Sequence, residues 1–307
     1  MGADTTTATD GGGVATRLSR YLPGGDESGR LPYLMVVPAV AWYVLFLLLP
    51  LAVIVVYSFL TYVSYSVEFT FTLDAWRSTV FTGQTLSVFV RTIGIGVGVT
   101  LLTLAFGYPL AYYLRFYASQ NGGLILLLFL IIPFWTSGLI RTTGWIPLLG
   151  RTGVVNTTLL WVGVINEPLS WLLFSPFSQI IGYLQSYLVF MAAPIFISLA
   201  QIDDNLLDAS ATLRGGPFTT FHKVTWPLSL PGVAIGSIFV FVLSIGDFVI
   251  PQFLSGGQAT ISTLVYFLIN SGLNYPASSA LSLALLAVIL ACVFLMIRVV
   301  DISEIIR

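Results

Sequence analysis

The chain has 307 residues, of which 57% are hydrophobic and only 8% are charged, and its net charge is −1 at pH 7. An ordinary soluble domain carries about 25% charged residues, so this composition is typical of an integral membrane protein. The nearly neutral balance gives no indication of a nucleic-acid partner, and the single cysteine, Cys292, excludes an intrachain disulfide.

Residues 1–30 are rich in Thr, Gly and Asp and contain no apolar core. This composition is typical of a disordered segment and not of a cleavable signal peptide. We therefore expect a disordered cytoplasmic tail over 1–30 and a transmembrane domain over 31–307.

Long stretches without any Asp, Glu, Lys or Arg follow the tail. A membrane-spanning helix needs about 20 apolar residues, and the strands of an outer-membrane barrel would alternate instead. The six uncharged stretches are 31–67, 92–114, 116–140, 168–202, 224–246 and 248–297. They predict an all-α integral membrane protein with six transmembrane helices, at about 33–60, 88–114, 123–142, 178–200, 229–252 and 279–300.

The distribution of Lys and Arg predicts the direction of these helices, because inner loops carry the excess of positive charge. With the N-terminus inside, the inner segments hold Arg17, Arg20, Arg30, Arg115, Arg214, Lys223, Arg298 and Arg307, and the outer segments hold Arg77, Arg91, Arg141 and Arg151. Both termini are therefore expected to be cytoplasmic.

Two further features concern how the helices end and pack. Residues 143–177 contain apolar runs that are too short to span, and we expect short helices at the outer membrane surface there, although a seventh span remains an alternative. Gly94 and Gly98 have the spacing that allows close approach of another helix, either within this chain or from a partner subunit.

A polar segment from Asp203 to Pro231 separates the fourth and fifth predicted spans. Asp204 is a suitable cap for a helix that starts at Asn205, and the Gly215–Gly216 pair would end that helix. A second short helix would then begin at Pro217 and end at Pro227. Both helices are amphipathic, so they would either dock into a groove on a soluble protein or lie on membrane lipid.

The same segment resembles the cytoplasmic EAA loop of bacterial ABC importer permeases. The matching residues are Asp208, Ala209, Ser210, Gly215, Phe221, Val224 and Pro227. The chain departs from the family pattern by having Asp208 for Glu, Ser210 for Ala and Trp226 for Leu. It also has Arg214 at the usual Gly position, with Gly215 and Gly216 retained immediately after it.

Other segments are similar to spermidine/putrescine permease subunits. They are Pro133–Ser137, Ile140–Thr142, Leu149–Gly153, Ile165–Leu169 and Gly246–Pro251, in the family's order, and the resemblance covers about residues 30–300. The implied fold is that of a type I ABC importer permease with a cytoplasmic coupling-helix loop at about 203–228, in a bacterial inner membrane. The implied substrates are polyamines or similar small organic cations, while relatives of this group import opines and other solutes.

The resemblance also implies partners. A second permease subunit, homologous or identical, would complete the pathway, and an extracytoplasmic solute-binding protein would deliver the substrate. A cytoplasmic ABC ATPase dimer would bind the loop through Asp208, Ala209, Ser210, Arg214, Gly215, Gly216, Phe221 and Pro227. The chain itself contains no GxxxxGK[ST] phosphate-binding sequence, so ATP hydrolysis is expected on that separate subunit.

Asp247 is the acidic residue that stands deepest within uncharged sequence, and we expect it in the outer half of the fifth span. Charged groups inside membranes usually face a cavity or a partner. Asp247 would therefore either attract a cationic substrate or form a structural pair with Arg91 or Arg141.

A second candidate cluster consists of Phe134, Trp135 and Arg141 near the third span. Aromatic faces attract ammonium groups, although single rings more often pack against lipid or neighbouring helices. Arg141 is better suited to positioning a loop or pairing with an acid. The one histidine, His222, has no other metal-ligating residue nearby, so we expect neither a metal site nor a cofactor.

Two alternatives belong to other classes of membrane protein. An ion-coupled secondary transporter would normally show inverted repeats and several charges inside its spans. A membrane-embedded enzyme would need clustered His, Asp or Glu in its spans. Neither pattern is present, so both interpretations are disfavoured.

Overall fold

The computed structural model describes residues 31–300, so the predicted tail over 1–30 lies outside the described residues. The chain divides into two compact units at Val53. Within 31–53, α2 (Leu31–Tyr43) passes through a π-helical turn (Val44–Leu48) into α3 (Leu49–Tyr57). Residues Val36–Tyr57 are apolar and long enough to cross a membrane, as predicted for the first span.

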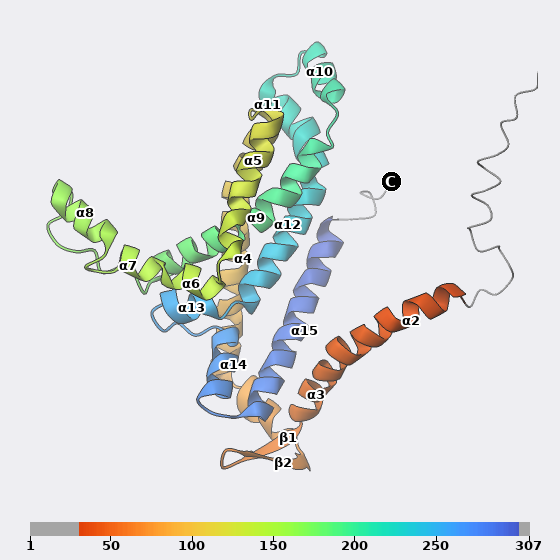
Figure 1. Ribbon diagram of the computed structural model, residues 1–307, viewed down its shortest axis with the longest axis vertical. Coiled ribbons are helices and arrows are strands. Elements are labelled where there is room, and N and C mark those ends of the chain that lie inside the picture. Colours follow the sequence, from red (N-terminus) through yellow and green to blue (C-terminus); the bar gives the residue numbers. More distant parts are fainter. Residues whose placement is uncertain (1–30, 301–307) are drawn as a thin grey trace, which may run out of the picture. The chain divides into compact units, whose positions relative to one another are not determined.

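The second unit is almost entirely helical and contains all the remaining elements. Its helices are α4 (Gly83–Phe116), α5 (Gln120–Ile131), α6 (Gly138–Thr143), α7 (Trp145–Leu149), α8 (Val154–Val162), α9 (Pro176–Ala200), α10 (Asp204–Thr212), α11 (Pro217–Thr220), α12 (Trp226–Gly246), α13 (Val249–Leu254), α14 (Ile261–Asn270) and α15 (Tyr275–Val300). α10 and α11 lie at one end of this unit, and the hairpin formed by β1 and β2 lies at the other (Figure 1).

The hairpin is an element that the sequence analysis did not predict. β1 (Leu60–Val63) pairs antiparallel with β2 (Ser66–Phe71), and Val63 lies opposite Ser66. The two residues between the strands, Ser64 and Tyr65, both have positive φ, which matches the twist of a tight two-residue hairpin. Neither residue is the Gly or Asn that usually marks such a turn, so the sequence signal is weak.

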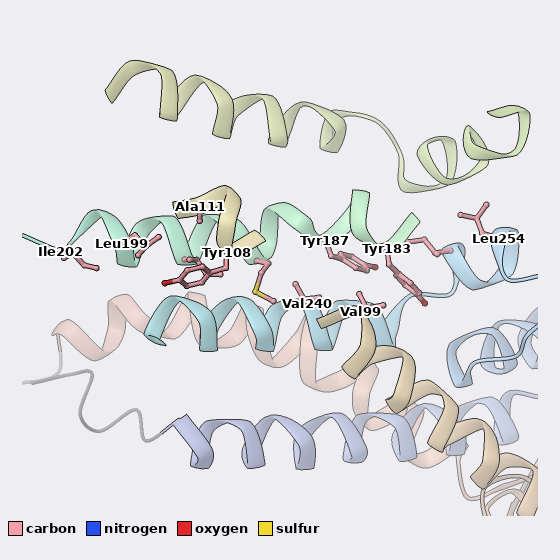
Figure 2. Packing of buried hydrophobic residues seen from close by; sticks show 12 residues of the cluster. Val99, Tyr108, Ala111, Tyr183, Tyr187, Leu199, Ile202, Val240 and Leu254 are labelled. Carbon is pink, nitrogen blue, oxygen red and sulfur yellow. The ribbon is translucent and has the colours of Figure 1, made fainter. Parts of the chain in front are cut away.

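α4, α9 and α12 pack together to form the core of the second unit. Their contact faces bury large side chains, including Tyr108 from α4, Tyr183, Met191 and Ile195 from α9, and Val240 from α12 (Figure 2). Close approach requires glycine at some positions, because a Cβ added at Gly96 would lie 2.7 Å from an Ile245 side-chain carbon.

The predicted glycine pair is not used for packing within the described chain. A Cβ added at Gly94 or Gly98 would meet no atom within 4 Å. The helix contact instead uses Gly96, which lies between them on the face turned toward α12. The GxxxG pair is therefore not a contact within the described chain, and its use by a partner subunit stays a prediction.

Five helices among the described residues are long and apolar enough to span a membrane. They correspond to five of the six predicted spans. The exception is 123–142, where α5 ends at Ile131, a short 3₁₀ turn (Ile132–Trp135) follows, and α6 begins at Gly138. Pro133 explains this interruption, because proline lacks the N–H that an uninterrupted helix needs.

The predicted fifth span also needs correction. α12 ends at Gly246, Asp247 has an extended backbone, and α13 begins only at Val249. Between α6 and α9, α7 and α8 are short helices and no described segment of 143–177 is long enough to span, as predicted. Their position at the outer membrane surface stays a prediction.

Candidate functional site

Residues 203–228 form the predicted docking loop, called the docking loop below, which begins shortly after α9 ends at Ala200. Asp203 caps α10, and its Oδ1 accepts a hydrogen bond from the Asn205 N–H at 2.9 Å. The predicted cap, Asp204, is wrong by one residue. Adjacent aspartates are equally good caps by type, and Asp204 instead forms the first turn of the helix and an ion pair with Arg115.

The end of α10 also differs from the prediction. Arg214 has φ of 59°, so this residue, and not the glycine pair, makes the left-handed break. A non-glycine residue pays about 1 kcal/mol for this conformation. The break thus falls at the position where the EAA pattern has its glycine.

Gly215 is required for a different reason, namely the close approach of Ser210. The Gly215 N–H donates to the Ser210 carbonyl oxygen at 2.8 Å. An added Cβ would lie 2.6 Å from Ser210 Oγ and 2.8 Å from its carbonyl oxygen, whereas at Gly216 it would meet nothing within 4 Å. A side chain is therefore excluded at Gly215 but has room at Gly216.

Pro227 does not end the second helix, contrary to the sequence prediction. α11 continues through a π-helical turn (Phe221–Thr225) into α12, which gives one helix from Pro217 to Gly246. Pro227 directly follows the π-helical turn, where the regular i→i−4 ladder is already interrupted, so its missing N–H is tolerated. The docking loop is therefore continuous with a core helix.

Some of the predicted docking residues face solvent and others face the protein. Asp208, Ala209, Arg214, Gly216 and Pro227 are exposed, and Ser210, Gly215 and Phe221 are partly buried. Leu213 and Phe218, at 84% and 81% exposure, add two large apolar side chains to the exposed set. Large exposed apolar side chains beside charged ones are typical of an interaction surface.

Phe221 anchors the loop to α4 and does not face outward. Its ring lies 5.8 Å from that of Tyr108 and 6.0 Å from that of Tyr112, both edge-on. Trp226 joins the same cluster, with its ring 5.1 Å from that of Tyr108. Such aromatic contacts hold the base of the loop against the core.

Arg115 makes a second connection, which the sequence analysis did not identify. Its guanidinium donates to Asp204 Oδ1 at 2.7 Å, to the Ile202 carbonyl at 3.2 Å and to the Leu199 carbonyl at 3.3 Å. This is the one ion pair that the structure shows within residues 31–300. One side chain from α4 therefore binds both the end of α9 and the start of α10.

Asp247 lies in the break between α12 and α13. Its Oδ1 accepts hydrogen bonds from the N–H groups of Val249 at 2.7 Å and Ile250 at 3.2 Å. Its Oδ2 accepts one from the Tyr187 hydroxyl at 2.6 Å. The predicted alternative of an ion pair with Arg91 or Arg141 is not seen among the described residues.

A cavity of about 430 Å³ opens beside this break. Asp247 and Tyr187 line it, together with Arg141 and Thr142 from α6. The structure thus brings two of the four predicted pathway residues, Arg141 and Asp247, to one cavity that α6, α9, α12 and α13 enclose.

The other two predicted pathway residues do not line this cavity. Phe134 packs edge-on against Phe190 at 5.2 Å, and the Arg141 guanidinium lies over the Phe134 ring at 4.8 Å. Trp135 is 84% exposed. Arg141 also donates to the Pro133 carbonyl at 2.9 Å, so it holds the interruption between α5 and α6 in place.

Comparison with known proteins identifies the family. The chain is 35% identical over 225 residues to the spermidine/putrescine transport system permease protein PotB of Escherichia coli (strain K12), which covers 73% of this chain and 81% of that protein. The chain belongs to this family of ABC transporter permeases. No protein-family model matches the permease.

Further relatives and solved structures agree. The permease is 29% identical over 262 residues to PotB of Haemophilus influenzae, covering 84% and 90% of the two chains. It is 31% identical over 208 residues to the inner membrane ABC transporter permease protein YdcU of Escherichia coli (strain K12), covering 64% and 66%.

At the level of fold, the permease resembles a crystal structure of a bacterial ABC transporter involved in the import of the acidic polysaccharide alginate. The TM-score is 0.68 at 20% identity, covering 88% of this chain and 95% of that one. The family and the helical membrane fold expected from the sequence are therefore confirmed.

From the contacts of Arg115, we predict that removing its side chain weakens the mechanical coupling between the docking loop and the core helices. In Arg115→Met, the Leu199 and Ile202 carbonyls lose their donor, and we expect ATP hydrolysis by the assembled complex to continue with reduced uptake per ATP. The measurement is the ratio of substrate imported to ATP hydrolysed in proteoliposomes.

The matched control for this experiment is Asp204→Asn, which removes only the exposed ion pair. Such surface pairs contribute at most about 1 kcal/mol, so this variant should retain nearly normal coupling. Equal loss in both variants would show that the ion pair, and not the carbonyl contacts, carries the effect.

Proposed function

We propose that this permease forms the translocation pathway of an ATP-driven importer for polyamines or similar small organic cations. The substrate class is supported by the relatives, several of which are named as spermidine/putrescine permeases. In this chain, the substrate class is supported by the Asp247 carboxylate, which lies beside the 430 Å³ cavity. Opines or other small solutes are the alternative cargo for the same class of importer.

The Asp247 carboxylate has capacity for a cationic ligand despite its three hydrogen bonds. A carboxylate offers about four lone-pair sites, so one remains for an ammonium group. Arg141 lines the same cavity, but its guanidinium is bound to the Pro133 carbonyl and the Phe134 ring. We therefore assign Asp247 to the substrate and Arg141 to the support of the α5–α6 interruption.

The proposed assembly follows the family. An ABC ATPase dimer binds the docking loop through the exposed residues Asp208, Ala209 and Arg214, together with Leu213 and Phe218. A second permease subunit completes the pathway. A solute-binding protein delivers the substrate, which is supported by the structural relative crystallised with a pentasaccharide-bound periplasmic protein.

We further propose that the permease lies in a bacterial inner membrane with both termini and the docking loop in the cytoplasm. The named location of the relative YdcU and the distribution of Lys and Arg support this orientation. A reporter fused after Arg214 should report the cytoplasm, and one inserted at 150–170 should report the opposite side. The same side for both positions would refute the orientation.

The paired glycines provide a test of the docking role. We expect Gly215→Val to abolish ATP-driven uptake, because its side chain would collide with Ser210 and deform the surface beside Arg214. At Gly216, one residue further on, a Cβ meets no atom within 4 Å, so Gly216→Val should retain uptake. Both variants should insert normally, since the spans are unchanged.

The measurement for this glycine pair is co-purification of the ATPase with each variant from detergent extracts, together with uptake. Normal ATPase binding and normal uptake in Gly215→Val would contradict a docking role for this loop.

The substrate role is tested by Asp247→Asn. The amide oxygen can still accept from the N–H groups of Val249 and Ile250, and the Tyr187 hydroxyl can turn to the Leu243 carbonyl, which lies 3.3 Å away. The fold is therefore retained while the charge is lost. Loss of a buried charge partner costs about 2 kcal/mol or more, so uptake per assembled complex should fall at least about tenfold.

Tyr187→Phe serves as the companion variant, because it removes one hydrogen bond and keeps the carboxylate charge. It should retain most of the uptake. If Asp247→Asn instead loses assembly with the partner subunits, or transports normally per complex, the pathway role of Asp247 is wrong.

A further inference from the structure

A second cavity lies on the other side of the break between α12 and α13. Its volume is about 390 Å³, and α12, α14 and α15 contribute to its wall. Among the described residues, only Gly246 and Phe248 line both this cavity and the cavity of Asp247. The two cavities therefore adjoin at the residues that flank Asp247.

Phe248 is the only one of the two shared residues that has a side chain. Its ring stacks on that of Tyr266, with centroids 4.9 Å apart and planes 14° from parallel. The Phe248 side chain is 37% exposed, so one face is covered by Tyr266 while the rest borders open space. The ring thus stands at the boundary between the two cavities.

The backbone around Phe248 is also held in place. The preceding residue, Asp247, accepts hydrogen bonds from the N–H groups of the two residues that follow Phe248. A ring that is stacked on one side and carried by a tethered backbone has few alternative positions. The stack and the tethered backbone therefore both favour the position of the Phe248 ring, called the partition below, at this boundary.

The second cavity has the chemistry to accept the far end of an extended organic cation. Val265, Leu285, Leu286 and Ile289 provide an apolar wall for methylene groups. Tyr266 offers an aromatic face, which attracts ammonium groups once Phe248 no longer covers it. No charged residue lines this cavity within the described chain.

We propose that Phe248 determines specificity by limiting the length of the substrate whose ammonium group binds at Asp247. The inference rests on the proposed function. With the ring in place, the rest of the substrate is confined to the first cavity. Without it, the two cavities join and a longer polyamine gains apolar contacts in the second.

The test compares uptake of putrescine, spermidine and the longer spermine by the complete importer in proteoliposomes, with the same binding protein throughout. Delivery by the binding protein is common to all variants, so its preference cancels when each variant is divided by wild type. In Phe248→Ala the spermine-to-putrescine uptake ratio should rise about tenfold, the effect of a few methylene groups entering an apolar pocket.

Two further variants keep the result interpretable. Phe248→Trp enlarges the partition and should shift the ratio in the opposite direction. Leu286→Ala enlarges the second cavity without opening the boundary and should leave the ratio at its wild-type value. All uptake rates are normalised to complex that co-purifies with the ATPase.

The possible outcomes separate the two proposals. An unchanged ratio in both Phe248 variants, with wild type importing polyamines, would overturn the partition and leave the proposed function standing. A shift in Leu286→Ala equal to that in Phe248→Ala would also overturn it. Failure of wild type to import any of the three polyamines would overturn the proposed function, and the partition with it.

Discussion

The architecture depends on satisfying backbone groups where helices are interrupted inside an apolar environment. The hydrocarbon region of a membrane offers no water to an unpaired N–H or C=O. Two interruptions occur near the same cavity, and each is stabilised by one charged side chain. Asp247 accepts from the N–H groups that begin α13, and Arg141 donates to the Pro133 carbonyl where α5 ends.

This arrangement explains why charged residues are kept at a cavity in a chain with so few of them. Each one has a structural partner in the backbone and, in addition, faces the cavity. A structural role and a substrate role are therefore not alternatives at Asp247. The same hydrogen bonds that satisfy the backbone orient the carboxylate toward the space through which we propose the substrate passes.

Sequence patterns predicted the parts of the fold that depend on composition. The uncharged stretches located α4, α9 and α15, because a span is defined by length and hydropathy alone. The EAA resemblance located the segment that contains α10 and α11. The exact residues at the ends of α10 were predicted wrongly. Asp203 caps the helix in place of the adjacent Asp204, and Arg214 makes the left-handed break in place of the adjacent glycines.

Long-range contacts were the other kind of feature that the sequence could not predict. From the sequence, Arg115 is only one of the positive charges that indicate the direction of the spans. In the structure it joins α4 to α9 and α10. The cavity that brings Arg141 and Asp247 together depends on residues more than a hundred positions apart. Phe248 falls within the family-like segment Gly246–Pro251, but nothing in that pattern distinguishes it from its neighbours, since its importance arises from the two cavities it separates.

The Arg115 contacts have a consequence for the lipid requirements of the protein. In α4, the 23 uncharged residues 92–114 lie between Arg91 and Arg115 and extend about 35 Å, slightly more than the roughly 30 Å of a hydrocarbon core. Arg115 is thereby held near one bilayer surface, and it carries the docking loop with it. A thinner bilayer increases the excess length of this stretch, which α4 relieves by tilting, and a slightly thicker bilayer removes that excess. Acyl-chain length would then adjust the angle at which the loop meets its partner.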